Sequence, residues 1–77
     1  MMPMYYFHIR DGSTFEIDPD GTELPDISAA QAEALKVAHE LLREVADLGQ
    51  KAVLEIADEH GRTVLTMPLS DALWLRH

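Results

Sequence analysis

YYFHIRDGSTFEI (residues 5–17) and VLEIADEHGRTVLTM (residues 53–67) are two stretches in which apolar and polar residues alternate on either side of a glycine. Such alternation is typical of strands with one buried face, and a glycine between two such runs indicates a hairpin. Between them, residues 28–48 repeat apolar side chains at helical spacing. The chain is therefore predicted to be one α+β domain over residues 1–77: a two-layer β-β-α-β-β arrangement with a four-stranded, mainly antiparallel sheet, one long helix on one face and a short C-terminal helical turn.

The register of the first hairpin follows from the need to bury one face of the sheet. Phe7 and Phe15 can share that face only if the loop has three residues and ends at a left-handed Gly12, which closes a G1 bulge. A slip of one residue would turn every side chain of the second strand to the other face. The predicted register pairs Phe7 with Phe15 and Tyr5 with Ile17.

The second hairpin is predicted by the same rule. A three-residue loop ends at a left-handed Gly61, and the strands pair Ile56 with Val64 and Leu54 with Thr66. Both glycines then have a backbone role in a turn, so neither indicates a phosphate-binding loop.

The helix is predicted to begin at Ser28, where Gln31 completes a capping box and Ile27 provides a hydrophobic staple. Gly49 suits the position just after the helix end. The apolar stripe of the helix and the inward positions of the strands give the predicted core: Tyr5, Phe7, Ile9, Phe15, Ile17, Leu24, Ala34, Ala38, Leu41, Val45, Leu54, Ile56 and Val64.

The composition excludes some classes of partner. The 77 residues include 14 acidic and 6 basic ones, which gives a formal charge of −8. Nucleic acids and anionic membrane surfaces bind through cations, so neither is an expected partner. The chain has no cysteine, its opening residues lack the regions of a signal peptide, and no apolar run is long enough to span a bilayer. A cytoplasmic protein is therefore expected.

The predicted registers leave apolar side chains on the face of the sheet away from the helix. Val53, Leu65 and Met67 would lie there, on a face that antiparallel sheets normally keep polar. Either Leu69, Leu73 and Trp74 cover them, or a second copy of the chain does. The predicted interaction surface consists of Val53, Leu65, Met67, Leu69 and Trp74. The first functional hypothesis is an interaction or structural module that acts as a homodimer or as an adaptor.

The alternative is a domain that senses a small ligand or an ion. One candidate site is the polar face of the first strand, formed by Tyr6, His8 and Arg10. The other is the acidic loop of residues 18–26. That loop resembles the start of a calcium-binding EF-hand but lacks its glutamate, in whose place stands Ala29.

Nothing in the sequence predicts catalysis, a metal site or a cofactor. The four histidines make no local metal-binding pair, and there are no cysteine ligands. The serines lie in predicted loop or cap positions, and none lies in a nucleophile elbow. A non-enzymatic domain without cofactor is therefore expected.

Three landmarks resemble those of a family of short, uncharacterised bacterial proteins. They are the opening YYFHIRDG (residues 5–12), the stretch DGTELPD (residues 20–26) before the helix, and DEHGRTVL (residues 58–65) near the end. The family has a Tyr/Phe-His opening, a Leu-Pro-Asp before one helix and an Asp…Gly-Arg hairpin. The resemblance covers nearly the whole chain and implies a free-standing bacterial domain, with no activity or ligand attached to it.

Overall fold

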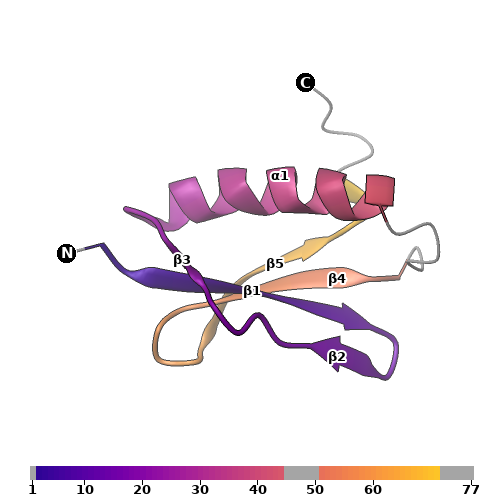
Figure 1. Ribbon diagram of the computed structural model, residues 1–77, viewed down its shortest axis with the longest axis horizontal. Helices are drawn as coiled ribbons and strands as arrows, with labels where there is room; N and C mark the ends of the chain where they lie inside the picture. Colours follow the sequence, from indigo (N-terminus) through magenta and orange to yellow (C-terminus); the bar gives the residue numbers. More distant parts are fainter. Residues whose placement is uncertain (1, 45–50, 72–77) are drawn as a thin grey trace.

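The structure is a computed structural model that describes residues 2–44 and 51–71, apart from the side chain of Glu44. These residues form one helix and five strands (Figure 1). Their order is β1 (Met4–Asp11), β2 (Thr14–Glu16), β3 (Thr22–Glu23), α1 (Ile27–Glu44), β4 (Val53–Ala57) and β5 (Thr63–Pro68). The α+β prediction, with one helix packed on an antiparallel sheet, is confirmed.

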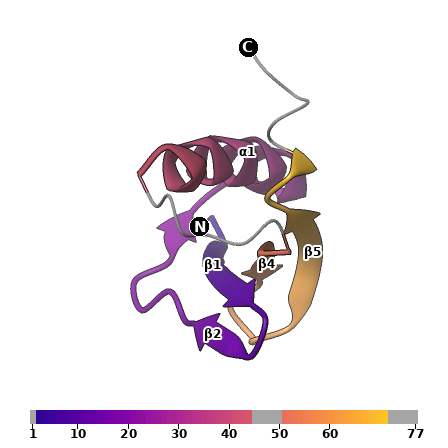
Figure 2. The same cartoon turned by 90° about the vertical axis from the view of Figure 1, so that its right-hand side faces the viewer.

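The sheet has the strand order β2-β1-β4-β5, and the two-residue β3 pairs with the beginning of β1. All of these pairs are antiparallel. The helix α1 crosses one face of the sheet, and no helix of the described residues lies over the other face (Figure 2). Among the described residues, no helix combines the length and the apolar character that a membrane span requires.

The core lies between α1 and the two central strands. Phe7 of β1 pairs with Ile56 of β4, and Ile9 pairs with Leu54, so these four side chains share the face under the helix. Small side chains on α1 let the helix approach this face closely. The buried core cluster consists of Tyr5, Phe7, Ala30, Ala34, Ala38, Ala52, Leu54, Ile56, Met67 and Leu69.

The predicted register of the first hairpin is wrong. The turn has two residues, Gly12 and Ser13, and Arg10 pairs with Phe15. Gly12 has a φ of 63°, whereas Ser13 does not have a positive φ, since only glycines do among the described residues. A positive φ at the first of the two turn residues alone is the feature of a type II′ turn. Phe15 therefore lies on the face opposite Phe7. It is 39% exposed, and Ile17 is 66% exposed, so neither belongs to the core.

The second hairpin has the predicted loop, but its strands do not keep the predicted register. The N–H of Asp58 donates to the carbonyl of Arg62 at 2.8 Å, and Gly61 has a φ of 83°. A register shift then follows between Ile56 and Ala57, so that Ile56 pairs with Leu65. The bulge moves the rest of β5 by one residue and turns its side chains over.

In the predicted interaction surface, the placement of Leu65 and Met67 is wrong because of this bulge. Met67, which pairs with the buried Leu54, is only 7% exposed, and Leu65 packs against the core from the same face. Leu69 is 1% exposed, and its N–H donates to the carbonyl of Ala52 at 2.9 Å. Val53 stays half-buried on the other face. Trp74 lies outside the described residues.

The helix begins at Ile27, one residue before the predicted start. Asp26 is the N-cap: its Oδ1 accepts the N–H of Ala29 at 2.9 Å, and its carbonyl accepts the N–H of Ala30 at 3.1 Å. Ser28 is therefore inside the helix, and Ile27 is 49% exposed and provides no staple. The predicted helix end near Gly49 and the core residue Val45 lie outside the described residues, as does the part of the predicted C-terminal helical turn beyond Asp71.

Candidate functional site

The face of the sheet opposite α1 carries a row of aromatic and charged side chains, which we call the outer-face cluster. The structure brings together the predicted Tyr6, His8 and Arg10, which alternate along β1 with the buried Tyr5 and Phe7. It adds two residues that the sequence did not predict for this site. The cluster consists of Tyr6, His8, Arg10, Phe15 and Glu55.

The aromatic side chains of the outer-face cluster form a continuous series of contacts. The rings of Tyr6 and His8 stack, with centroids 6.3 Å apart and planes at 19°. His8 meets Phe15 edge to face, with centroids 5.5 Å apart. The guanidinium carbon of Arg10 lies 4.4 Å from the centroid of the Phe15 ring, within the range of a cation–π contact. Phe15 is therefore held on the outer face by two neighbours on β1.

Arg10 also forms an ion pair with Glu55 of β4, where Nε lies 2.6 Å from Oε2. An ion pair at the surface contributes about 0–1 kcal/mol, so it adds little to the stability of the fold. Its consequence is local: it balances the charge of Arg10 and fixes the guanidinium group beside Phe15. The outer-face cluster is thus ordered and close to neutral in charge.

Asp18 anchors the loop between β2 and β3 to the edge of β1. Its Oδ2 accepts the N–H of Phe7 at 3.2 Å, and its Oδ1 accepts the N–H groups of Asp20 at 3.1 Å and Gly21 at 3.2 Å. The N–H of Asp18 donates to Nδ1 of His8 at 3.0 Å. Since a backbone N–H only donates, Nδ1 is the acceptor, and the neutral ring of His8 carries its proton on Nε2.

Burial has the largest single effect on the pKa of Asp18 and raises it, but hydrogen bonds outweigh this effect. The N–H groups of Phe7, Gly21 and Asp20, which donate to its carboxylate, hold the pKa of Asp18 below its usual value. Asp18 is therefore a carboxylate whose oxygens are engaged in organising the backbone. This arrangement gives Asp18 a structural role in the acidic loop.

Asp58 plays a similar part in the loop between β4 and β5. Its Oδ1 accepts the N–H groups of His60 and Arg62, both at 2.9 Å. The N–H of Arg62 has the largest effect on the pKa of Asp58, and it lowers that pKa. Among the described residues, no group of three or more His, Cys, Asp or Glu side chains is arranged to hold a metal ion.

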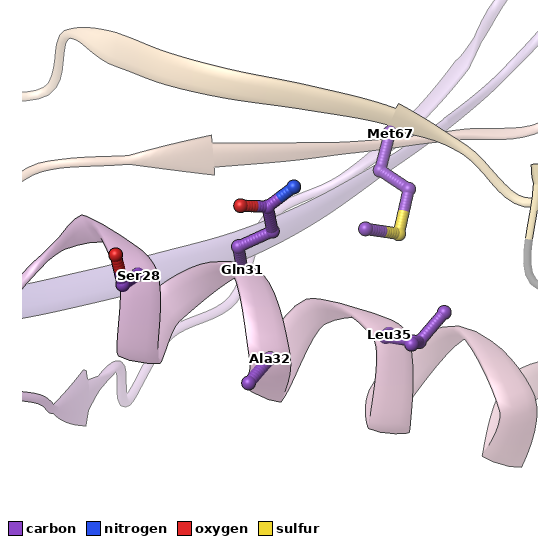
Figure 3. A pocket seen from close by; sticks show the side chains of 5 residues that line it. All are labelled: Ser28, Gln31, Ala32, Leu35 and Met67. Carbon is purple, nitrogen blue, oxygen red and sulfur yellow. The ribbon is translucent and has the colours of Figure 1, made fainter. Parts of the chain in front are cut away.

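Open cavities lie along both sides of α1. One of about 280 Å³ lies between α1 and β5 and is lined by Ser28, Gln31, Ala32, Leu35 and Met67. In Figure 3, Met67 points from β5 toward α1, and Gln31 points from α1 toward the strands. This cavity has no charged side chain among its described lining residues.

The second cavity, also of about 280 Å³, lies between α1 and the side of the sheet that carries β1 and β2. We call it the acidic groove, because the two charged side chains among its described lining residues, Glu16 and Asp18, are both acidic. Its lining residues are Phe7, Ile9, Glu16, Ile17, Asp18, Thr22 and Val37.

The segment of sequence that runs from β1 to β5 matches a known sequence family. Residues 4–70 match the family model described as "Domain of unknown function (DUF6894)". The chain belongs to this family. The resemblance inferred from the sequence is thereby confirmed, and the DUF6894 match includes the outer-face cluster and both cavities. Searches of the curated proteins and of the solved structures gave no match.

Sequence reasoning missed two members of the outer-face cluster in the DUF6894 domain. Phe15 was missed because the hairpin was given the wrong loop, although Gly-Ser between two strands is a recognised signal of a two-residue turn. Glu55 was missed because its nearness to Arg10 depends on β4 lying beside β1. Arg10 and Glu55 are 45 positions apart in the chain, and no local sequence pattern predicts that they meet.

Proposed function

We propose that this domain is a non-enzymatic protein-interaction module that binds through the outer face of its sheet. The observation that supports the proposal is Phe15, a large aromatic side chain that is 39% exposed on the face of the sheet opposite α1. Tyr, Phe and Arg are enriched at protein interfaces, and the outer-face cluster contains all three. The contacts with His8 and Arg10 already order the side chain of Phe15 in the free protein. Binding of a partner to Phe15 therefore costs less side-chain entropy than binding to a mobile side chain would.

The partner we propose is a second copy of the same chain. The chain as a whole carries a charge of −8, which opposes self-association. The outer face is the exception, since Arg10 and Glu55 balance each other there. A two-fold dimer brings the same patch of both copies together, and a patch with balanced charges suits such a contact.

The size of the required contact is compatible with this domain. A stable interface buries ~1,200 Å² in total, hence ~600 Å² per copy, about a tenth of the 5348 Å² of accessible surface. Absence of cysteine supports a reducing compartment such as a bacterial cytoplasm as the place of this contact.

Recognition of a small ligand by Tyr6, His8 and Arg10 has less support. The guanidinium group of Arg10 is already engaged with Glu55 and Phe15, and Nδ1 of His8 already accepts the N–H of Asp18. A ligand would have to compete with contacts that the chain makes by itself.

The test is the molar mass in solution, measured by light scattering and sedimentation over a series of protein and salt concentrations. Dimer is expected, and added salt is expected to strengthen it by screening the repulsion between the two acidic chains. Phe15→Ser is expected to weaken the dimer, whereas Ile17→Ser, at a more exposed residue beside the acidic groove, is expected to leave it unchanged. A monomer at high protein and high salt, or equal effects of the two substitutions, would overturn the proposal.

A further inference from the structure

The acidic groove has an apolar floor that is open to solvent. Phe7 and Ile9 of β1 form it from the sheet side, and Val37 forms it from α1. Ile17 lies at its border and is 66% exposed, the highest value among the exposed large apolar residues of the described chain. With about 280 Å³, the cavity lies below the ~300–1,000 Å³ of small-molecule sites. Its size therefore suits a side chain or two of a bound segment.

The sheet side of the acidic groove carries negative charge. Glu16 and Asp18 line it from the sheet side, and no lysine or arginine is among its described lining residues. On α1, Glu33 and Glu40 are neighbours of Val37 on the helix surface, and Lys36, three residues after Glu33 and four before Glu40, is a neighbour of both. The negative charge of the groove therefore comes mainly from Glu16 and Asp18. The hydrogen bonds that Asp18 accepts also keep its carboxylate charged.

We propose that the acidic groove binds a basic amphipathic segment of another protein, which places apolar side chains against Phe7, Ile9, Ile17 and Val37 and lysine or arginine side chains beside the bordering carboxylates. The charge of the groove selects this occupant. A second copy of this chain is a poor fit, because it has 6 basic residues against 14 acidic ones. This proposal concerns a different surface from the outer-face cluster and does not depend on self-association.

The test uses two fluorescein-labelled peptides with repeats of Leu-Lys-Lys-Leu or Leu-Glu-Glu-Leu, titrated with the full chain and followed by fluorescence anisotropy. The lysine peptide is expected to bind and the glutamate peptide is not. Ile17→Ser is expected to weaken binding about tenfold through lost apolar contact. Glu16→Gln is expected to weaken it up to about fivefold through one lost ion pair. Added salt is expected to weaken binding, the opposite of its expected effect on the dimer.

Two controls separate the groove from a general attraction of a basic peptide to an acidic protein. Glu59→Gln removes the same charge from the exposed loop between β4 and β5, and Phe15→Ser removes an exposed apolar side chain from the outer face. Both are expected to leave peptide binding unchanged. Equal weakening of peptide binding by Glu59→Gln and Glu16→Gln, or no effect of Ile17→Ser on it, would overturn the proposal. Loss of self-association in Ile17→Ser would also overturn it, because that result would place a second copy of the chain in the groove.

Discussion

The carboxylate of Asp18 accepts the backbone N–H of Phe7 at 3.2 Å, across eleven positions of the chain. It does so on β1 between two short strand partners: β2 pairs with residues 9–11, and β3 pairs with residues 4 and 5. A buried N–H without an acceptor costs about 1–3 kcal/mol. The side chain of Asp18 thus supplies an acceptor where neither strand reaches, and it fixes the loop that borders both the outer-face cluster and the acidic groove.

Asp18→Asn is expected to lower the free energy of unfolding at pH 7 by about 1–3 kcal/mol. The reason is that an amide NH₂ cannot accept a hydrogen bond, so one of the three backbone donors loses its partner. Urea denaturation followed by circular dichroism measures the change. Asp20→Asn in the same loop, at an exposed residue, is the control and is expected to stay within about 0.5 kcal/mol. Equal effects of the two would contradict the role of Asp18.

The same carboxylate gives the stability of the fold a defined dependence on pH. The folded-state pKa of Asp18 is lowered, so the unfolded chain binds a proton at pH values where the folded protein does not. The stabilisation is fully present above the unfolded pKa of about 4 and is lost as pH falls through the folded pKa. As the pH is lowered from 7 to below about 4, the free energy of unfolding is expected to fall more for the wild-type protein than for Asp18→Asn, as urea denaturation at each pH measures. Parallel profiles of the two would contradict this.

Gly21→Ala is expected to destabilise the fold more than Gly61→Ala. Both glycines have positive φ, so both substitutions carry a backbone penalty of about 1–2 kcal/mol. At Gly21 a Cβ would also lie 2.7 Å from Cε2 of Tyr6, whereas at Gly61 it would meet nothing within 4 Å. Melting temperatures of the two variants measure the difference. A lower melting temperature for Gly61→Ala would show that the ring of Tyr6 moves away freely.

Asp26→Ala is expected to cost about 1 kcal/mol of stability, because the N–H of Ala29 loses the side-chain acceptor at the helix start. Ser28→Ala, inside the first turn of α1, is expected to change stability by less than about 0.5 kcal/mol. Chemical denaturation of both variants compares the two capping assignments. A larger loss for Ser28→Ala would restore Ser28 as the N-cap.

Met67→Ala is expected to cost about 2–5 kcal/mol, since the side chain is buried between β5 and α1. Total stability for a chain of 77 residues is about 4–12 kcal/mol, so this loss is a large share of it. Ile27→Ala, at an exposed apolar residue of α1, is expected to stay within about 0.5 kcal/mol. Wild-type stability of Met67→Ala would contradict the register shift in β5.

The sequence by itself determined the elements whose signals are local. Alternation in β1 and β4 places Tyr5, Phe7, Leu54 and Ile56 on one face, and the spacing of alanines on α1 matches that face. The loop that ends at Gly61 is also local, because its hydrogen bonds join residues no more than four positions apart. These features follow from backbone geometry and side-chain periodicity, and they are sufficient for the fold class.

Only the tertiary structure decided which face each edge strand presents. Two-residue and three-residue turns at Gly12 are both compatible with the sequence, and they send Phe15 to opposite faces. The structure has Phe15 on the outer face, where Arg10 and His8 contact it. The shift in β5 likewise turns Met67 into the core. A strand has a period of two, so a single residue gained or lost in a turn or bulge reverses every side chain beyond it, and contacts between distant parts of the chain decide which reversal is stable.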